Sequence, residues 1–166
     1  MKKVIIGFIA VCMIFQLTSC RLRVMERDEM MEFLDGLAEN LGASQITGDS
    51  DLIGERLCGR DAYTGRYLAE CDGNTGKDVV FGGGSIETRK VYICGYVMAY
   101  SGKATVRIRM NEDVIVLEPD EDGYFSTEVN MNSGGNYIMV NYENFTGTVD
   151  LTAGYAPLSG PLCAEV

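Results

Sequence analysis

Tyrosines and carboxylates are the side chains of this sequence that are best suited to contact a ligand. The chain has 166 residues, with nine tyrosines and 24 Asp or Glu residues, and it contains neither histidine nor tryptophan. Without histidine, a serine or cysteine nucleophile lacks its usual general base and zinc lacks its commonest ligand. Catalysis would then depend on two carboxylates, as in glycoside hydrolysis, but a sequence does not show whether two acids lie at the needed separation. We assign no catalytic residue, no cofactor and no metal ligand.

The tyrosines offer aromatic faces that suit stacking on a sugar ring or covering the surface of a protein partner. They are Tyr63, Tyr67, Tyr92, Tyr96, Tyr100, Tyr124, Tyr137, Tyr142 and Tyr155. Most of them lie in strand-like segments, where tyrosine is also an ordinary packing residue. This pattern favours binding over catalysis, with ordinary packing as the alternative role for each ring.

Two acidic segments have the oxygen-rich composition of cation-binding loops. Residues 72–78 begin like an EF-hand loop, but Lys77 and Gly83 occupy the sixth and twelfth positions, where that loop needs glycine and glutamate. The second segment covers residues 118–122. Both are predicted to be exposed polar turns rather than metal sites.

The first twenty residues have the pattern of an export signal. Two lysines precede an uncharged apolar run over residues 4–15, which is shorter than the about 20 residues that a membrane-spanning helix needs. Residues 17–20, LTSC, follow, and this tetrapeptide resembles the lipobox of bacterial lipoproteins. The resemblance implies that residues 1–19 are a signal peptide and that the thiol of Cys20 is lipidated, which would anchor the chain in the membrane. An ordinary secretory signal with an incidental cysteine is the alternative.

Four of the six cysteines remain once Cys12 and Cys20 are assigned to the N-terminal segment. An even number of cysteines in an exported domain favours two disulfides. We predict that Cys58 pairs with Cys163, which would join the two ends of the β region, and that Cys71 pairs with Cys94. The alternative is that some of the four stay reduced as small buried apolar side chains.

An amphipathic helix is predicted over residues 24–41, ahead of the β region. Its apolar side chains follow the i, i+3, i+4 spacing, and Gly42 is a plausible stop. We expect this helix to pack on the domain as a cap, with partner binding as the alternative. Residues 43–59 contain several glycines and polar residues and are predicted to be a linker.

From about residue 62 the apolar pattern takes a period of two, which is typical of half-buried strands. The clearest case is residues 104–110, where Ala104, Val106 and Ile108 alternate with polar or charged residues. About eight short strands with turns between them, and no helical pattern among them, predict an all-β fold. We expect a jelly-roll-like antiparallel β-sandwich over residues 61–166, with a closed barrel as the second choice. Residues 20–60 would form the anchor region, helix and linker.

The expected function follows from the signal and the composition together. The globular part resembles uncharacterised surface lipoproteins of Gram-positive bacteria in segments such as residues 61–65 and 143–147. No activity is known for these lipoproteins, so the resemblance implies no site residues. We expect a lipid-anchored extracytoplasmic protein that acts as a non-catalytic binding module for carbohydrate or protein. A small carboxylate-dependent hydrolase and a purely structural envelope protein are the alternatives. The net charge of -10 and the lack of a basic stripe in the sequence argue against a nucleic-acid partner.

Overall fold

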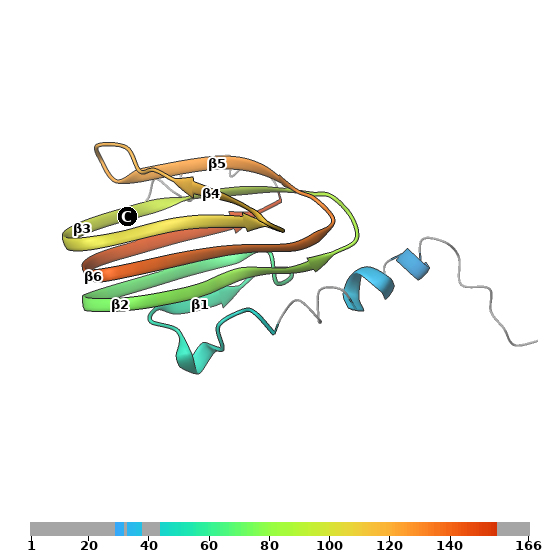
Figure 1. The fold of residues 1–166 in the computed structure, drawn as a ribbon, viewed down its shortest axis with the longest axis horizontal. Helices are drawn as coiled ribbons and strands as arrows, with labels where there is room; N and C mark the ends of the chain where they lie inside the picture. Colours follow the sequence, from blue (N-terminus) through green and yellow to red (C-terminus); the bar gives the residue numbers. More distant parts are fainter. Residues whose placement is uncertain (1–28, 32, 38–43, 156–166) are drawn as a thin grey trace, which may run out of the picture. The chain divides into compact units, whose positions relative to one another are not determined.

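Six antiparallel strands make up most of the structure (Figure 1), a computed structural model that describes residues 29–31, 33–37 and 44–155. The strands are β1 (Glu55–Cys58), β2 (Gly65–Ser85), β3 (Arg89–Met110), β4 (Asp113–Leu117), β5 (Tyr124–Met131) and β6 (Gly134–Gly154). A short 3-10 turn, η1 (Asp49–Asp51), precedes β1. The predicted all-β antiparallel sandwich is confirmed.

The sheet is continuous and has the strand order β1-β2-β6-β3-β4. β6 pairs with β2 on one side and with β3 on the other over most of its length. The first part of β3 also pairs with β5, and its last part pairs with β4. The three long strands therefore run through both layers of the sandwich. Residues 65–71 of β2, 147–154 of β6 and 89–99 of β3 lie with β1 and β5 in the first layer, and the remaining parts lie with β4 in the second.

The three long strands bend at the same level, which we call the corner (residues 72–76, 100–103 and 143–146). Figure 1 shows them turning side by side at the left of the view, and the pairing registers shift there. Gly102 has a φ of 69°, and a Cβ atom at this position would lie 2.0 Å from the carbonyl oxygen of Asn144. Glycine is therefore required at this position, where the backbone of β3 lies close to that of β6.

The core lies between the two layers. One cluster of buried side chains includes Ile93 and Leu151 of the first layer and Ile108, Ile138 and Val140 of the second, all at most 1% exposed. Burying each such side chain contributes about 1.5–3 kcal/mol, so contacts between layers hold the bent sheet closed. The alternation seen in residues 104–110 places its apolar members in this core, as predicted.

The number of strands differs from the expected count because β2, β3 and β6 each continue through a segment where the apolar alternation of the sequence is interrupted. The apolar pattern of β3 is interrupted at the corner, so residues 91–99 and 104–110 look like two strands although they form one. The same applies to β2 and β6. Six strands therefore replace the predicted eight or so.

The predicted boundary between linker and sandwich is too late in the chain. β1 lies inside the predicted linker and pairs with β2, so the sheet begins before residue 61. This strand was missed because it has only four residues and most of its side chains are exposed, which leaves no clear alternation.

The chain divides into two compact units, Met1–Glu32 and Phe33–Val166. In the first unit the structure describes residues 29–31, and these are helical. In the second unit residues 33–37 are helical, so the described part of the predicted range 24–41 is a helix and the rest lies outside the described residues. Among the residues described, no helix is long and apolar enough to cross a membrane.

Candidate functional site

The structure divides the tyrosines by their burial. Four are core residues with at most 2% exposure: Tyr63, Tyr67, Tyr137 and Tyr142. Three half-buried tyrosines lie in β3 and β5: Tyr92, Tyr96 and Tyr124. Tyr100 lies at the corner with 80% of its surface exposed, and Tyr155 is half-buried next to Arg89. Ordinary packing therefore explains the buried four, and the half-buried three remain as candidates for ligand contact.

The three half-buried tyrosines lie on the outer face of the first layer. Val91 and Ile93 of β3 point into the core, so the pleat of the strand turns Tyr92 and Tyr96 outward. Tyr124 of β5 is the direct cross-strand partner of Tyr96. Their ring centroids are 5.1 Å apart and the rings are tilted by 53°, an arrangement that the charge distribution of aromatic rings favours.

An Arg–Asp pair lies beside the two rings. Asp150 of β6 is the cross-strand partner of Tyr96 on the side opposite to Tyr124. Arg66 of β2 donates from Nε to Oδ1 of Asp150 over 2.9 Å and from Nη2 to Oδ2 over 2.5 Å. The hydrogen bond to Asp150 raises the pKa of Arg66. Such a bidentate pair fixes the carboxylate, and the side chains of Arg66 and Asp150 remain 49% and 19% exposed.

A second ion pair lies on the same face. Nζ of Lys90 is 2.6 Å from Oε1 of Glu128, which is the cross-strand partner of Tyr92. The hydrogen bonds from Lys90 and from Tyr92 lower the pKa of Glu128. We call the set Tyr92, Tyr96, Tyr124, Arg66, Asp150, Lys90 and Glu128 the tyrosine face.

The chemistry of the tyrosine face suits binding more than acid catalysis. A general acid needs a raised pKa, whereas Glu128 is held as a carboxylate and Asp150 is fixed by Arg66. Aromatic rings next to fixed charged groups supply the stacking and hydrogen bonding that a sugar ring needs. The alternative of a carboxylate-dependent hydrolase gains no support from this face.

Asp78 is a buried acid inside the sandwich, where it binds backbone rather than solvent. Its side chain is 1% exposed, and its Oδ2 accepts from the backbone N–H groups of Ile53 and Gly54 over 2.8 and 3.2 Å. The same oxygen accepts from the hydroxyl of Tyr67. Burial raises the pKa of Tyr67, so the phenol stays protonated and remains a donor. Asp78 therefore fixes the chain before β1 against β2.

The segment over residues 72–78 was predicted to be an exposed polar turn, but it is a continuous part of strand β2 that passes through the corner. Oγ1 of Thr75 accepts from the backbone of Asn144 over 2.9 Å, and Oγ1 of Thr146 accepts from Gly73 over 2.9 Å. These bonds tie β2 to β6 where both strands bend. Within the ranges that the structure describes, no group of three or more Asp, Glu or Cys side chains is placed to hold a metal ion.

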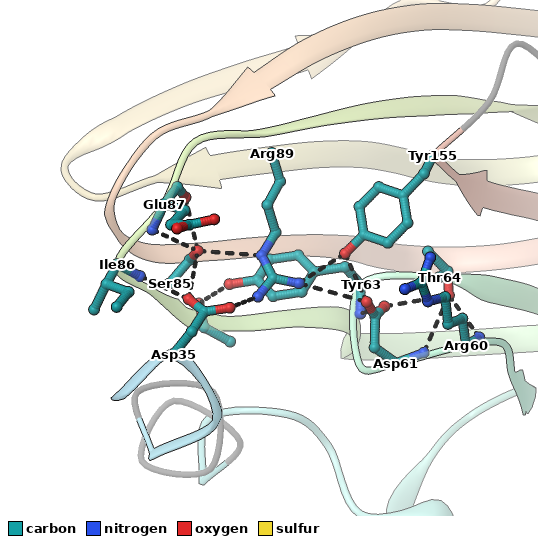
Figure 2. Close-up of polar contacts among 11 residues, drawn as sticks. Asp35, Arg60, Asp61, Tyr63, Thr64, Ser85, Ile86, Glu87, Arg89 and Tyr155 are labelled. Carbon is teal, nitrogen blue, oxygen red and sulfur yellow. Dashed lines mark hydrogen bonds and ion pairs between the residues drawn. The ribbon is translucent and has the colours of Figure 1, made fainter. Parts of the chain in front are cut away.

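Arg89 of β3 is the centre of a second polar network (Figure 2). Its Nη1 lies 2.9 Å from the hydroxyl of Tyr155 and 3.4 Å from Oδ2 of Asp61, and its Nη2 pairs with Asp35. The guanidinium also stacks over the ring of Tyr63 at 4.8 Å. Burial alone would lower the pKa of Arg89, but these partners outweigh burial and raise it. Arg89 therefore remains charged and neutralises two carboxylates.

The Arg89 network attaches the helical residues 33–37 to the end of the sheet. Oδ1 of Asp35 accepts from the backbone of Ile86 over 2.9 Å and from the hydroxyl of Ser85 over 3.1 Å. The side chain of Asp35 is only 17% exposed. Asp35 therefore joins residues 33–37 of the predicted helix to the β2–β3 connection. No sequence pattern indicated Arg89, because its partners Asp35, Asp61 and Tyr155 are distant along the chain.

Neither predicted disulfide is formed, because Cys58 and Cys71 are free thiols. Cys71 of β2 and Cys94 of β3 cannot pair, since β6 lies between these strands and Cys71 is opposite Gly147 whereas Cys94 is opposite Thr152. That separation exceeds the about 7 Å between Cα atoms that a disulfide spans. The predicted pair Cys58–Cys163 is wrong as well, since Cys58 is exposed and free at the end of the edge strand β1.

Several predicted features lie outside the described residues. They are the signal peptide over residues 1–19, the lipidated Cys20, the N-terminal Cys12 and the C-terminal Cys163. Their roles stay predictions.

Comparisons with known proteins add little to this geometry. No protein-family model matches the sequence, and no curated protein matches it either. Among solved structures, the chain is similar to the pre-peptidase C-terminal domain of collagenase from Bacillus anthracis, with 16% identity and a TM-score of 0.43 over 55% of this chain and 89% of that one. It is also similar to an exo-β-1,3-galactanase from Phanerochaete chrysosporium with galactose, with 14% identity and a TM-score of 0.29 over 68% of this chain and 28% of that one. Both likenesses are too distant to carry an argument about function.

Proposed function

We propose that this protein is a lipid-anchored, non-catalytic binding module that binds carbohydrate through the tyrosine face. The observation that carries the proposal is the cross-strand pair Tyr96–Tyr124 with the Arg66–Asp150 pair directly beside it. The rings offer an apolar surface to the C–H groups of a sugar, and the charged pair offers hydrogen bonds to its hydroxyl groups.

The rigidity of this face supports binding. The tyrosines lie on paired strands rather than on loops, so little conformational entropy is lost when a ligand contacts them. The carboxylates are already paired with cations, so neither has to lose a solvent shell alone when a sugar covers it. These two properties favour a preformed surface for a neutral ligand.

A glycan array tests the proposal with the full chain solubilised in detergent. We expect the wild-type protein to bind at least one neutral glycan, and the double variant Tyr96→Ala/Tyr124→Ala to bind it about tenfold more weakly or worse. Tyr100→Ala is the matched control, because it removes an exposed tyrosine at the corner and should leave binding unchanged. Equal losses in both variants, or no glycan bound by the wild type, would overturn carbohydrate binding at this face.

The lipid anchor is the second part of the proposal and rests on the lipobox-like residues 17–20. A diacylglyceryl group at Cys20 would hold the domain at the extracytoplasmic face of a membrane, since two acyl chains anchor far more stably than one. An exported location would put the tyrosine face where extracellular glycans are found.

Mass spectrometry of the protein from bacterial membranes tests this anchor. We expect a mature chain that begins at Cys20 and carries diacylglycerol, and a Cys20→Ser variant without lipid. Cys12→Ser is the matched control and should still be lipidated. A wild-type chain that keeps residues 1–19, or that begins at another residue without lipid, would refute the anchor while leaving the glycan experiment intact.

A further inference from the structure

The outer face of the second layer carries four basic side chains, which we call the basic face: Lys77, Lys103, Arg107 and Arg109. Ala104, Val106 and Ile108 of β3 point into the core, so the alternate residues 103, 107 and 109 point outward. Lys77 of β2 is opposite Asn141 of β6, which in turn is opposite Thr105 of β3. Residues opposite one another in a sheet point to the same face, so Lys77 points outward together with residues 103, 107 and 109. Three cations thus follow one strand, and the fourth lies two strands away, about 10 Å across the sheet.

Within the described ranges these four cations have no carboxylate partner, although the chain as a whole has a net charge of -10. The other basic residues of the sheet each pair with a carboxylate, as in Arg56–Asp49, Arg66–Asp150, Arg89–Asp35 and Lys90–Glu128. Among the described residues, no ion pair involves the basic face; Glu143 is opposite Lys103 in register but is not paired with it. The face therefore has positive charge available for an external anion.

Three of the five buried polar side-chain atoms that lack a partner among the described residues lie on the same face. In the described part of the chain, Nε of Arg107, Nε of Arg109 and Oδ1 of Asn141 are buried and have no hydrogen-bond partner. Buried polar groups are nearly always paired in proteins, with protein, water or ligand. Two of these three atoms are donors on cationic side chains, so hydrogen bonds among the described residues do not saturate the guanidinium groups of Arg107 and Arg109.

A cavity of about 250 Å³ adjoins these cations. Lys77 and Arg109 line it together with Gln45, Tyr137 and Met139. The guanidinium of Arg109 is already held in place, because it stacks over the ring of Tyr137 at 4.6 Å and hydrogen-bonds to Gln45. A cation fixed in this way binds an anion without losing much further side-chain freedom.

We propose that the basic face binds a linear acidic polysaccharide, a glycan that carries carboxylate or sulfate groups. The row of cations on β3 matches the repeated charge of an extended chain, and the cavity beside Arg109 accommodates one of its substituents. Guanidinium groups bind carboxylate and sulfate oxygens through charge-assisted hydrogen bonds. This site is separate from the tyrosine face and does not depend on it.

Two other polyanions fit the face less well. An anionic membrane is a broad surface that would also meet the acidic remainder of the domain, whereas a narrow polymer contacts the basic face alone. Single-stranded nucleic acid binds by stacking its bases on exposed aromatic rings, but Tyr137 is only 2% exposed beneath Arg109.

Titration calorimetry with the full chain in neutral detergent tests the proposal. The probes are polygalacturonate as the carboxylated glycan, heparin as the sulfated glycan and dextran as the neutral control. We expect the wild type to bind at least one acidic glycan more tightly than dextran. The double variant Lys77→Gln/Arg107→Gln should bind that acidic glycan about tenfold more weakly or worse.

The matched control is Arg66→Gln/Lys90→Gln, which removes the same charge from the tyrosine face and should leave acidic-glycan binding within about twofold of the wild type. Equal losses in both double variants would mean that net charge alone attracts the polymer and would overturn the site. So would tighter binding to vesicles of anionic phospholipid or to DNA than to either acidic glycan, or no binding to either glycan. The variant Tyr96→Ala/Tyr124→Ala should keep acidic-glycan binding. Each proposal can therefore be refuted without the other: neutral-glycan binding at the tyrosine face and acidic-glycan binding at the basic face.

Discussion

The phenolic oxygens of Tyr67 and Tyr142 lie 2.7 Å apart inside the sandwich, and Tyr67 also donates to Asp78. Tyr67 belongs to the part of β2 in the first layer, whereas Tyr142 and Asp78 belong to the second layer. These hydrogen bonds therefore connect the two layers across a core that is otherwise held by apolar contacts. A satisfied buried network of this kind favours one arrangement of the layers over others.

Substitution of Asp78 should destabilise the fold strongly. Asp78→Ala removes the acceptor of Tyr67 and of the Ile53 and Gly54 N–H groups, and each donor left without a partner costs about 1–3 kcal/mol. We expect the free energy of unfolding to fall by more than about 3 kcal/mol in urea titrations followed by circular dichroism.

Asp72→Ala is the control for this prediction, since Asp72 is an exposed aspartate on the same strand. Its effect should stay within about 0.5 kcal/mol. Similar urea midpoints for the two variants would show that the Asp78 contacts do not stabilise the fold.

The buried tyrosines should make the fold sensitive to alkaline pH. Burial raises the pKa of Tyr67, of Tyr142 and of Tyr155, the last to about 12. In the unfolded chain a tyrosine titrates near pH 10, so the folded state holds its protons more tightly. The stabilisation is therefore complete below about pH 10 and is lost as the pH rises through the folded-state pKa values.

Urea titrations at a series of alkaline pH values measure this dependence. The free energy of unfolding should be level up to about pH 10 and then decline. Tyr155→Phe should decline less steeply than the wild type between about pH 10 and 12, because one titrating group is absent. A stability that rises over this interval would contradict the assigned direction of the shifts.

The sequence predicts those features of the fold that depend on neighbouring residues. The period of two in residues 104–110 correctly places Ile108 in the core and Arg107 outside it. The bends were not predicted, because the corner interrupts this period and makes one long strand look like two short ones. A glycine with positive φ, such as Gly102, leaves no periodic signal of its own.

The candidate sites were only partly predictable for a different reason. The sequence indicated that tyrosines are the residues to examine, but the pairing of Tyr96 with Tyr124 depends on strand register. The basic face was missed because Lys77 is distant in the sequence from Arg107 and meets it only through β6. Its one local signal was the row of cations at alternate positions 103, 107 and 109. The disulfide predictions failed because sequence order does not reveal that β6 separates Cys71 from Cys94.

Two glycines of the corner separate the cost of a left-handed backbone from the cost of a close contact. Gly73 and Gly102 have nearly the same φ, 70° and 69°. A Cβ atom at Gly73 would meet nothing within 4 Å, whereas at Gly102 it would lie 2.0 Å from the carbonyl oxygen of Asn144. Gly73→Ala should therefore cost about 1–2 kcal/mol, and Gly102→Ala about 1–3 kcal/mol more.

Urea midpoints of the two glycine variants test this difference, with each variant serving as the control for the other. A larger loss in Gly102→Ala supports the close crossing of β3 and β6 at the corner. Equal losses would show that β3 and β6 move apart to admit the Cβ atom that Gly102→Ala adds without loss of stability. The backbone conformation alone would then explain why glycine occupies this position.

The two free cysteines should differ sharply in reactivity. Cys58 is exposed, whereas Cys71 is buried, and burial followed by the charge of Asp78 raises the pKa of the Cys71 thiol. Because the thiolate is the reactive form, iodoacetamide should alkylate Cys58 in the native protein and Cys71 only after unfolding in urea. Peptide mass spectrometry without reduction measures both, and Cys58→Ser should remove the native-state signal at this site. A peptide in which Cys58 is joined to another cysteine would contradict the free thiol, and it would restore the disulfide that the sequence alone had suggested.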